Sequence, residues 1–279
     1  MTSGQSHTPY ALKSPADWTL FVAHGDDVRR LVVFVHGFNG RSVKTWLDFP
    51  VAGGSRDWWR QADLLFVGYQ SLRDNISGVA GRLRRELPRF YPNPLPEAMT
   101  VGGVTARDSV TAYQELVLVG HSLGGVVLRR AMVDTAMRWR EAGQPDPAPS
   151  LLTGQLRLFS PASAGFQAAG LMGAVRATGI WAAIEFVLSS SSAYTDLQPN
   201  STILTETRVR TEHLATEEGL AALRAKIVWA NPDEVVITER YSTDYVDDPW
   251  DGKSHSSVCK PKVKNFEMPW NFVETGDVS

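Results

Sequence analysis

Cysteine is almost absent from the 279-residue sequence: the single Cys259 excludes an internal disulfide framework and a zinc site built from several thiolates. An excess of one charge is also lacking, since 28 Lys and Arg residues stand against 30 Asp and Glu residues. The formal net charge of −2 gives no large basic footprint for nucleic acid. Long hydrophobic runs are missing as well. The longest weakly polar stretch, residues 168–188, is interrupted by Arg176 and Glu185 and is a poor membrane span.

The N-terminal residues 1–9 are polar and lack the apolar segment of a signal peptide, so we expect a cytoplasmic protein. A composition of 43% hydrophobic and 21% charged residues is typical of a globular chain. We therefore expect one α/β domain over residues 1–279, without an integral membrane segment or a nucleic-acid partner. The oligomeric state does not follow from the sequence.

Gly and Pro residues divide the chain into short apolar runs that alternate with longer helical stretches. Within residues 76–90, for example, apolar residues recur at helical spacing. The expected strands are residues 18–23, 31–35, 64–69, 116–119, 156–159 and 227–230, and the expected helices include 76–90 and 123–141. This alternation predicts an α/β fold in which a mainly parallel sheet is covered by helices on both faces.

The segment Gly120-His121-Ser122-Leu123-Gly124 follows a strand without polar alternation and precedes an apolar helix. In such a Gly-x-Ser-x-Gly turn the serine occupies a strained corner at the carboxyl end of the strand. Side chains at Gly120 and Gly124 would clash with the neighbouring strand and helix. The context on both sides makes Ser122 a candidate nucleophile.

With this motif, the chain resembles the α/β-hydrolases of the serine esterase and lipase class. A second motif supports the resemblance: residues 33–38, Val-Phe-Val-His-Gly-Phe, are a strand that ends in His-Gly. In that superfamily this turn directs a backbone N–H at the developing oxyanion. The resemblance therefore implies that the N–H groups of Phe38 and Leu123 form the oxyanion hole. It also implies that His36 supports the loop, and we expect His121 to be structural.

The remaining members of the implied catalytic triad follow the serine in the order acid, then histidine. Two histidines lie downstream. His213 belongs to a charged, helical stretch with no strand before it, whereas His255 lies in a loop that leads to the last helix. Residues 252–261 resemble the histidine segment of the serine-active-site-containing lipase-like proteins. We therefore favour His255.

The triad acid has several candidates. In the superfamily it occupies the loop after the penultimate strand, and Asp233 directly follows the apolar run 227–230, with Glu234 beside it. Four aspartates of residues 244–251, Asp244 among them, also precede the histidine. They form an acidic, proline-containing loop that we expect to be exposed to solvent. Asp233 fits best, while Glu234 and the loop remain alternatives.

Two further segments narrow the resemblance. Gly40 with Lys44-Thr45-Trp46, and Phe159-Ser160-Pro161 followed by Gly165, resemble lipase-like serine esterases that include the inositol deacylases. Those relatives usually carry Thr-Pro-His where this chain has Ser-Pro-Ala at positions 160–162. The implied activity is hydrolysis of a small-molecule or lipid-like carboxylic ester through an acyl-enzyme on Ser122, without a metal or organic cofactor. An acyltransferase or thioesterase with the same triad, and a binding or signalling module with a relic site, are the alternatives.

Residues 161–225 are more numerous than a simple crossover between two strands requires. In this superfamily such an insertion commonly forms a cap over the nucleophile, and the alternative is an ordinary packed helix pair. Its apolar and aromatic residues, with Phe166 and Trp181 as candidate substrate contacts, predict a pocket for uncharged acyl chains of medium length. Activity should fall at acid pH as His255 becomes protonated.

Overall fold

Runs of apolar residues without polar alternation form the central strands, which are buried on both faces. The computed structural model describes residues 6–25, 27–52, 56–107, 112–167, 192–262 and 264–277. Eight strands form one sheet in the order β1-β2-β4-β3-β7-β8-β9-β11. Their bounds are His7–Ala11 (β1), Thr19–Ala23 (β2), Arg30–Val35 (β3), Ala62–Val67 (β4), Glu115–His121 (β7), Gln155–Phe159 (β8), Lys226–Val228 (β9) and Tyr245–Val246 (β11).

The strands from β4 through β3, β7, β8 and β9 to β11 pair in parallel, which confirms the predicted mainly parallel sheet. β2 pairs antiparallel with β1 and β4. The edge strand β1 was not predicted, because only one of its five residues is buried and its sequence carries no apolar pattern. Two small sheets lie outside the main one: β5 (Thr100–Val101) with β6 (Val104–Thr105), and β10 (Ala230–Asn231) with β12 (Trp250–Asp251).

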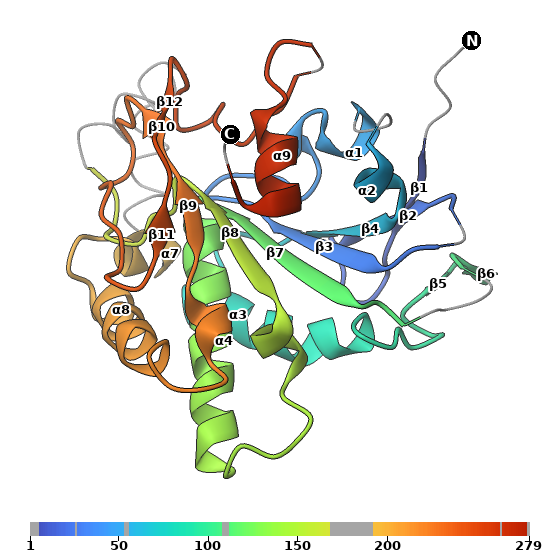
Figure 1. Cartoon of the computed structure of the whole chain (residues 1–279), viewed down its shortest axis with the longest axis horizontal. Helices are drawn as coiled ribbons and strands as arrows, with labels where there is room; N and C mark the ends of the chain where they lie inside the picture. The colour runs from blue at the N-terminus through green and yellow to red at the C-terminus, as the bar shows by residue number, and fades with distance from the viewer. Residues whose placement is uncertain are drawn as a thin grey trace.

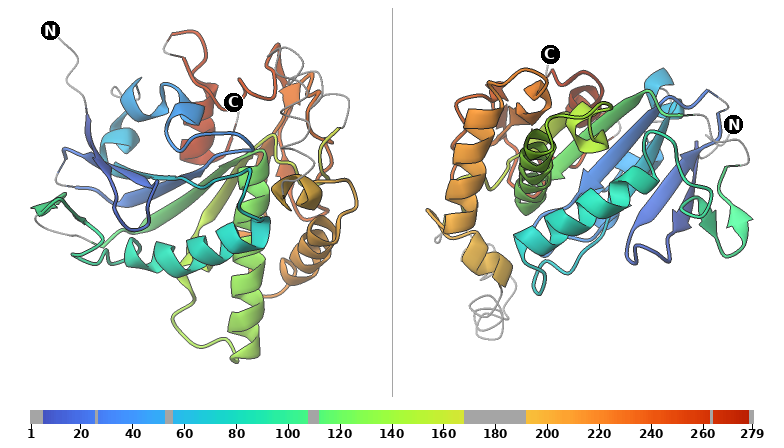
Figure 2. Two further views of the ribbon diagram at one scale, coloured as in Figure 1. Left: turned by 180° about the vertical axis from the view of Figure 1, so that it is seen from behind. Right: turned by 90° about the horizontal axis from the view of Figure 1, so that it is seen from below.

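Helices cover both faces of the sheet (Figure 1). One face carries α3 (Ile76–Glu86), α4 (Leu123–Glu141) and α8 (Thr202–Leu214), and the other carries α1 (Phe49–Ala52), α2 (Asp57–Arg60) and α9 (Met268–Thr275). The short α7 (Ser192–Asp196) precedes α8. Figure 2 shows α3 and α4 crossing on the same side of the sheet. Each face therefore encloses its own apolar core.

The two long helices follow their sequence patterns closely. α4 begins at Leu123 and ends at Glu141, as predicted. α3 begins at the predicted Ile76, where the Asn75 side chain accepts a hydrogen bond from Gly78 N–H at 2.7 Å. Its α-helical part ends at Glu86, four residues before the predicted end. A 3₁₀ turn, Leu87–Arg89, follows because Pro88 has no N–H for the helical hydrogen-bond pattern.

The expectation that the carboxylates of residues 244–251 are exposed is wrong at Asp244. Its side chain is fully buried and pairs with the equally buried Arg129 of α4 at 2.6 Å. The same carboxylate accepts backbone N–H groups of Tyr241 and Ala225. A buried carboxylate requires such partners. The sequence could not show that Arg129 is the partner of Asp244, because the two residues are 115 positions apart.

The predicted insertion, residues 161–225, is described in part. α8 packs against α4 on the face of the sheet that also carries α3. Trp181 and the rest of residues 168–191 lie outside the described residues, so a cap formed by them stays a prediction. No helix in the described ranges combines the length and apolar character needed to cross a membrane.

Candidate active site

Ser122 occupies a strained corner between β7 and α4. Its backbone angles, φ 54° and ψ −123°, lie in a region that non-glycine residues rarely adopt. A Cβ on Gly124 would collide with the Val35 carbonyl oxygen, and a Cβ on Gly120 would lie 2.7 Å from the Cα of Gly125. Both glycines of the motif are thus required by close backbone packing, and the packing holds the serine at the carboxyl edge of the sheet.

The loop after β3 lies directly against Ser122. A Cβ on Gly37 would lie 2.8 Å from the Ser122 Cβ, so only glycine fits between the loop and the serine. The next residue, Phe38, is half-buried, and its backbone N–H donates to no acceptor within the described residues. Leu123 is the first residue of α4, where backbone N–H groups have no intrahelical acceptor. Of the two predicted oxyanion donors, Leu123 directly follows the serine in the chain, and Phe38 follows Gly37, which lies against the serine.

Two hydroxyl groups from the segment after β4 fix this loop. Tyr69 Oη donates to the His36 carbonyl oxygen at 2.6 Å, and the Tyr69 and His36 rings stack with centroids 4.2 Å apart. Ser71 Oγ accepts the Asn39 N–H at 2.8 Å. His36 itself is buried and bonds through Nδ1 to Gly37 O, so it supports the loop. No local pattern indicates these roles of Tyr69 and Ser71, because their partners lie more than 30 positions away.

Asp233 and His255 meet through their side chains. His255 Nδ1 lies 3.0 Å from Asp233 Oδ2, with the carboxylate fully buried and the imidazole 10% exposed. The other carboxylate oxygen accepts the N–H groups of Val235 and Val236 at 3.1 and 3.2 Å. These bonds fix the rotation of the carboxylate. The carboxylate in turn fixes the imidazole, so that Nε2 is left for other partners.

The electrostatics of Asp233 favour the carboxylate form. Burial alone would raise its pKa, but the hydrogen bond and charge of His255, the Ser160 hydroxyl and the Val236 N–H hold the pKa below its ordinary value. Ser160 is fully buried at the end of β8, and its Oγ accepts the Ala230 N–H at 3.0 Å. Phe159-Ser160-Pro161 is recognisable as a motif in the sequence, but the link between Ser160 and the acid is not.

His121 also contacts the histidine loop. Its Nε2 lies 2.8 Å from the His255 carbonyl oxygen, and the centroids of the two rings are 4.9 Å apart. No hydrogen bond joins Ser122 Oγ to the His255 ring among the described residues. Nucleophile–base contacts are often long in the absence of substrate and shorten when it binds. The structure thus brings acid and histidine together, and connects them to Ser122 through its neighbour His121.

The alternative candidates lie elsewhere. Glu234 is exposed beside Asp233, and the His213 side chain is 71% exposed on α8, 3.8 Å from Glu217. Asp244 forms its ion pair with Arg129, and Asp251 accepts a hydrogen bond from the Asn231 side chain. Within the described part of the chain, no cluster of three or more His, Cys, Asp or Glu side chains could hold a metal ion.

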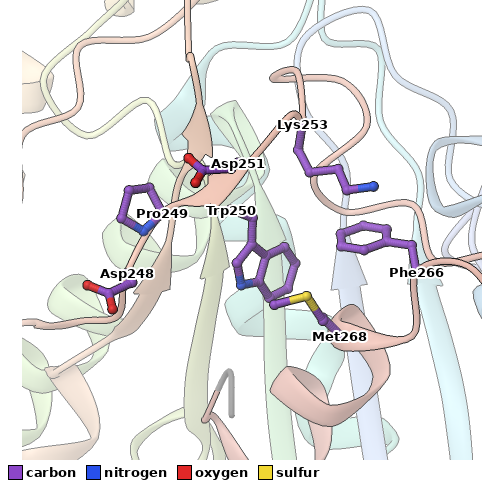
Figure 3. Close-up of a pocket in the computed structure, with 7 residues that line it drawn as sticks. All are labelled: Asp248, Pro249, Trp250, Asp251, Lys253, Phe266 and Met268. Atoms are coloured by element: carbon purple, nitrogen blue, oxygen red, sulfur yellow. The ribbon is translucent and has the colours of Figure 1, made fainter.

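Aromatic contacts anchor the residues just before His255. The Trp250 ring meets the Phe266 ring at 90° with centroids 5.2 Å apart, and Lys253 Nζ lies 3.7 Å from the centre of the Phe266 ring. A cavity of about 320 Å³ opens beside them (Figure 3). Its lining residues are Asp248, Pro249, Trp250, Asp251, Lys253, Phe266 and Met268. Residues 250–253 are thereby held against the segment that leads into α9.

Of the two candidate substrate contacts, one is described. Phe166 is buried, and its ring meets the Phe38 ring edge-on with centroids 6.0 Å apart. A β-bridge joins Phe166 to Val236, in the loop that carries Asp233. Phe166 therefore contacts both Phe38 and the loop that carries Asp233. Trp181 lies outside the described residues.

Buried neutral histidines predict a loss of stability in mild acid. Burial lowers the pKa of His36 to about 4 and that of His121 to about 3, the latter with a contribution from the charge of His255. Below pH 6.5 the unfolded chain binds a proton at each ring and the folded chain does not. We expect the unfolding free energy to fall by about 2.5 kcal/mol per pH unit between pH 6 and 4.5, the two sites together.

Urea unfolding between pH 8 and 4.5 measures this slope. His121→Gln should reduce it by about 1.4 kcal/mol per pH unit, because one of the two sites is removed. His213→Gln, at an exposed position, should leave it unchanged. A stability that is flat over this range in the unmodified protein would show that these rings are protonated in the folded state.

Comparisons with known proteins show relatives at the level of the fold. No family model matches the sequence, and no curated protein matches it. Among solved structures, the peroxisomal alpha-beta-hydrolase Lpx1 of Saccharomyces cerevisiae is 12% identical, with 98% of this chain and 82% of that chain covered and a TM-score of 0.50. A phosphonate-inhibited esterase B of Lactobacillus rhamnosis is 12% identical, with 96% and 84% covered and a TM-score of 0.53. The chain therefore has the α/β-hydrolase fold, as its motifs predicted.

Proposed function

We propose that the protein is a serine hydrolase that cleaves carboxylic esters through an acyl-enzyme on Ser122. The observation that carries the proposal is the 3.0 Å hydrogen bond between His255 Nδ1 and Asp233 Oδ2. It joins two loops whose residues lie 22 positions apart in sequence, at the sheet edge where Ser122 occupies its strained turn. A serine, a buried carboxylate and a histidine, in this chain order, are the parts that nucleophilic acyl transfer needs.

In the first half of the reaction, Ser122 Oγ attacks the ester carbonyl carbon while its proton passes to His255 Nε2. Asp233 holds the proton of Nδ1 and stabilises the imidazolium that forms. The N–H groups of Phe38 and Leu123 donate to the oxyanion, and each is worth roughly 3 kcal/mol. The imidazolium then returns its proton to the alcohol oxygen as the carbon–oxygen bond breaks, and the acyl group stays on Ser122.

In the second half, a water molecule attacks the acyl carbon and gives its proton to His255 Nε2. The same two N–H groups stabilise the second tetrahedral intermediate. Collapse of that intermediate releases the carboxylic acid and returns the proton to Ser122 Oγ. Each cycle consumes one ester and one water molecule and releases one alcohol and one carboxylic acid. His255 carries out all of its proton transfers, with Asp233 as the partner of the imidazole.

Steady-state hydrolysis of p-nitrophenyl esters tests the proposal. We expect release of p-nitrophenol in proportion to protein, with an initial burst if deacylation is the slower half. The same assay with added alcohols and thiols reports the competing acyl acceptors. Ester product in place of free acid would assign an acyltransferase, and hydrolysis restricted to thioesters would assign a thioesterase. An inactive protein with an unreactive serine would identify a relic site.

The apolar surroundings support uncharged acyl groups as substrates. The rings of Phe38 and Phe166 meet, and Phe38 follows Gly37, which lies against the serine. We assign Phe166 and Trp181 to the acyl pocket. The similar esterase B was solved with a tributyrin phosphonate, which is a short-chain acyl mimic. Each methylene buried in such a pocket contributes about 0.8 kcal/mol, or about fourfold in kcat/KM.

We therefore expect kcat/KM to rise several-fold per carbon beyond acetate and to level off at medium chain length. Esters of two to twelve carbons, assayed with and without Trp181→Ala, measure the profile. Loss of the optimum in the variant at an unchanged melting temperature would place Trp181 in the pocket. Equal rates for acetate and hexanoate esters in the unmodified protein would contradict an apolar acyl pocket.

A further inference from the structure

The loop that carries His255 has few hydrogen bonds to the rest of the protein. Most of those made by residues 253–260 run within the segment, for example between Ser254 and Ser257. Among the described residues, the exceptions are a 4.0 Å contact of Cys259 Sγ with the Thr45 carbonyl oxygen and the two bonds of His255. One of these two holds the imidazole, and the other holds the backbone carbonyl.

The carbonyl is held by His121, which directly precedes Ser122. A carbonyl oxygen only accepts, so the 2.8 Å contact requires a proton on His121 Nε2 and leaves Nδ1 without one. Nδ1 is buried, has no hydrogen-bond partner in the part of the chain that the structure describes, and faces Gly37, where an added Cβ would lie 3.1 Å away. The His121 ring therefore fills the space between the loop after β3, which contains Gly37, and the loop that carries His255. It donates a hydrogen bond to the second of these loops.

His121 stays neutral while it does so. Its side chain is buried, and burial is the main cause that lowers its pKa to about 3. The ring of His255 lies 4.9 Å away, so a charge on His121 would disfavour the imidazolium that His255 must form. A neutral N–H donor fixes the loop without that electrostatic cost. Lysine or arginine at this position would lack this property.

We propose that His121 is a positioning residue that sets the distance between Ser122 and His255. Because His121 directly precedes the serine in the chain, its hydrogen bond ties the loop of the base to the backbone of the nucleophile itself. Asp233 fixes the rotation of the imidazole, and His121 fixes the position of the backbone that carries it. This inference rests on the proposed function of Ser122 and His255.

Three neutral variants separate anchoring from packing. The amide nitrogen of glutamine reaches about as far as the Nε2 of histidine and can donate to the same carbonyl. The amide of asparagine reaches only as far as Nδ1. Phenylalanine keeps the ring but has no hydrogen-bond donor. We expect His121→Gln to retain kcat within threefold. His121→Asn and His121→Phe should lose roughly 10- to 100-fold in kcat with little change in KM, because a displacement of about 1 Å is costly in an active site.

Hydrogen–deuterium exchange of the same proteins gives a readout that does not need activity. Backbone amides of residues 253–257 should exchange faster in His121→Phe than in the unmodified protein and His121→Gln, at matched melting temperatures. Equal exchange and equal kcat in His121→Phe and the unmodified protein would overturn the proposal. A glutamine variant as impaired as the phenylalanine variant would also overturn the proposal, because that result would show that His121 acts by packing and not by its hydrogen bond.

Failure of the proposed function has a different signature. In that case the unmodified protein neither hydrolyses esters nor reacts with a fluorophosphonate. The exchange experiment still reports whether His121 holds the loop. An active protein with no difference among the three variants leaves Ser122 and His255 assigned and removes His121 alone.

Discussion

Ser122→Ala is expected to reduce ester hydrolysis by about 10⁴- to 10⁶-fold, the loss that removal of an acyl-transfer nucleophile typically causes. The hydroxyl is the group that becomes acylated, whereas the backbone strain at φ 54° belongs to the turn and remains. The measurement is kcat/KM for a short-chain p-nitrophenyl ester, with circular dichroism and thermal unfolding to show that the fold is retained.

Ser163→Ala is the matched control for this substitution. Ser163 is also buried, and its hydroxyl has no hydrogen-bond partner in the described residues, so removing it should leave hydrolysis unchanged. An alanine variant at Ser122 that keeps more than a few per cent of the activity would contradict the acyl-enzyme. A loss shared equally by both variants would indicate a general effect on folding.

Asp233→Asn is expected to lower kcat by roughly 10⁴-fold while the protein stays folded. An amide can present an N–H to His255 Nδ1 where the carboxylate accepts one, which favours the wrong tautomer and leaves the imidazolium without its counter-charge. Glu234→Gln, at the exposed neighbouring position, should change kcat by less than twofold. The opposite ranking would transfer the acid role to Glu234.

A second control distinguishes the catalytic acid from a structural one. Asp244→Asn weakens the buried ion pair with Arg129, and loss of a partner from such a pair costs about 3–5 kcal/mol of stability. We expect a lower melting temperature with kcat per folded molecule nearly unchanged. Mild effects of Asp233→Asn on kcat, with a strong effect of Asp244→Asn, would place the acid in the 244–251 loop.

The elements that the sequence predicted well are those whose signal is local. The bounds of α4 follow from an apolar helical pattern that starts directly after Ser122, and β3 and β7 are uninterrupted apolar runs. The glycines of the serine motif also have their explanation within a few residues of the turn. Short-range sterics and periodicity are fully present in the sequence, so these features could be derived from it.

The features that the sequence did not predict depend on distant partners. Asp244 looks like one of several solvated aspartates until the fold places Arg129 beside it. Tyr69 and Ser160 carry no motif of their own for the roles they have at the loop and at the acid. The edge strand β1 is held by pairing with β2 and not by a buried face. Each of these depends on tertiary contacts that no local pattern encodes.

Mapping of a fluorophosphonate adduct by mass spectrometry tests the central claim most directly. The reagent reacts with a serine only where a neighbouring base activates it and an oxyanion hole stabilises the adduct. We predict one adduct per chain, located on Ser122 and absent from Ser122→Ala and from heat-denatured protein. A protein that hydrolyses esters but carries the adduct on another residue, or carries none, would contradict the account.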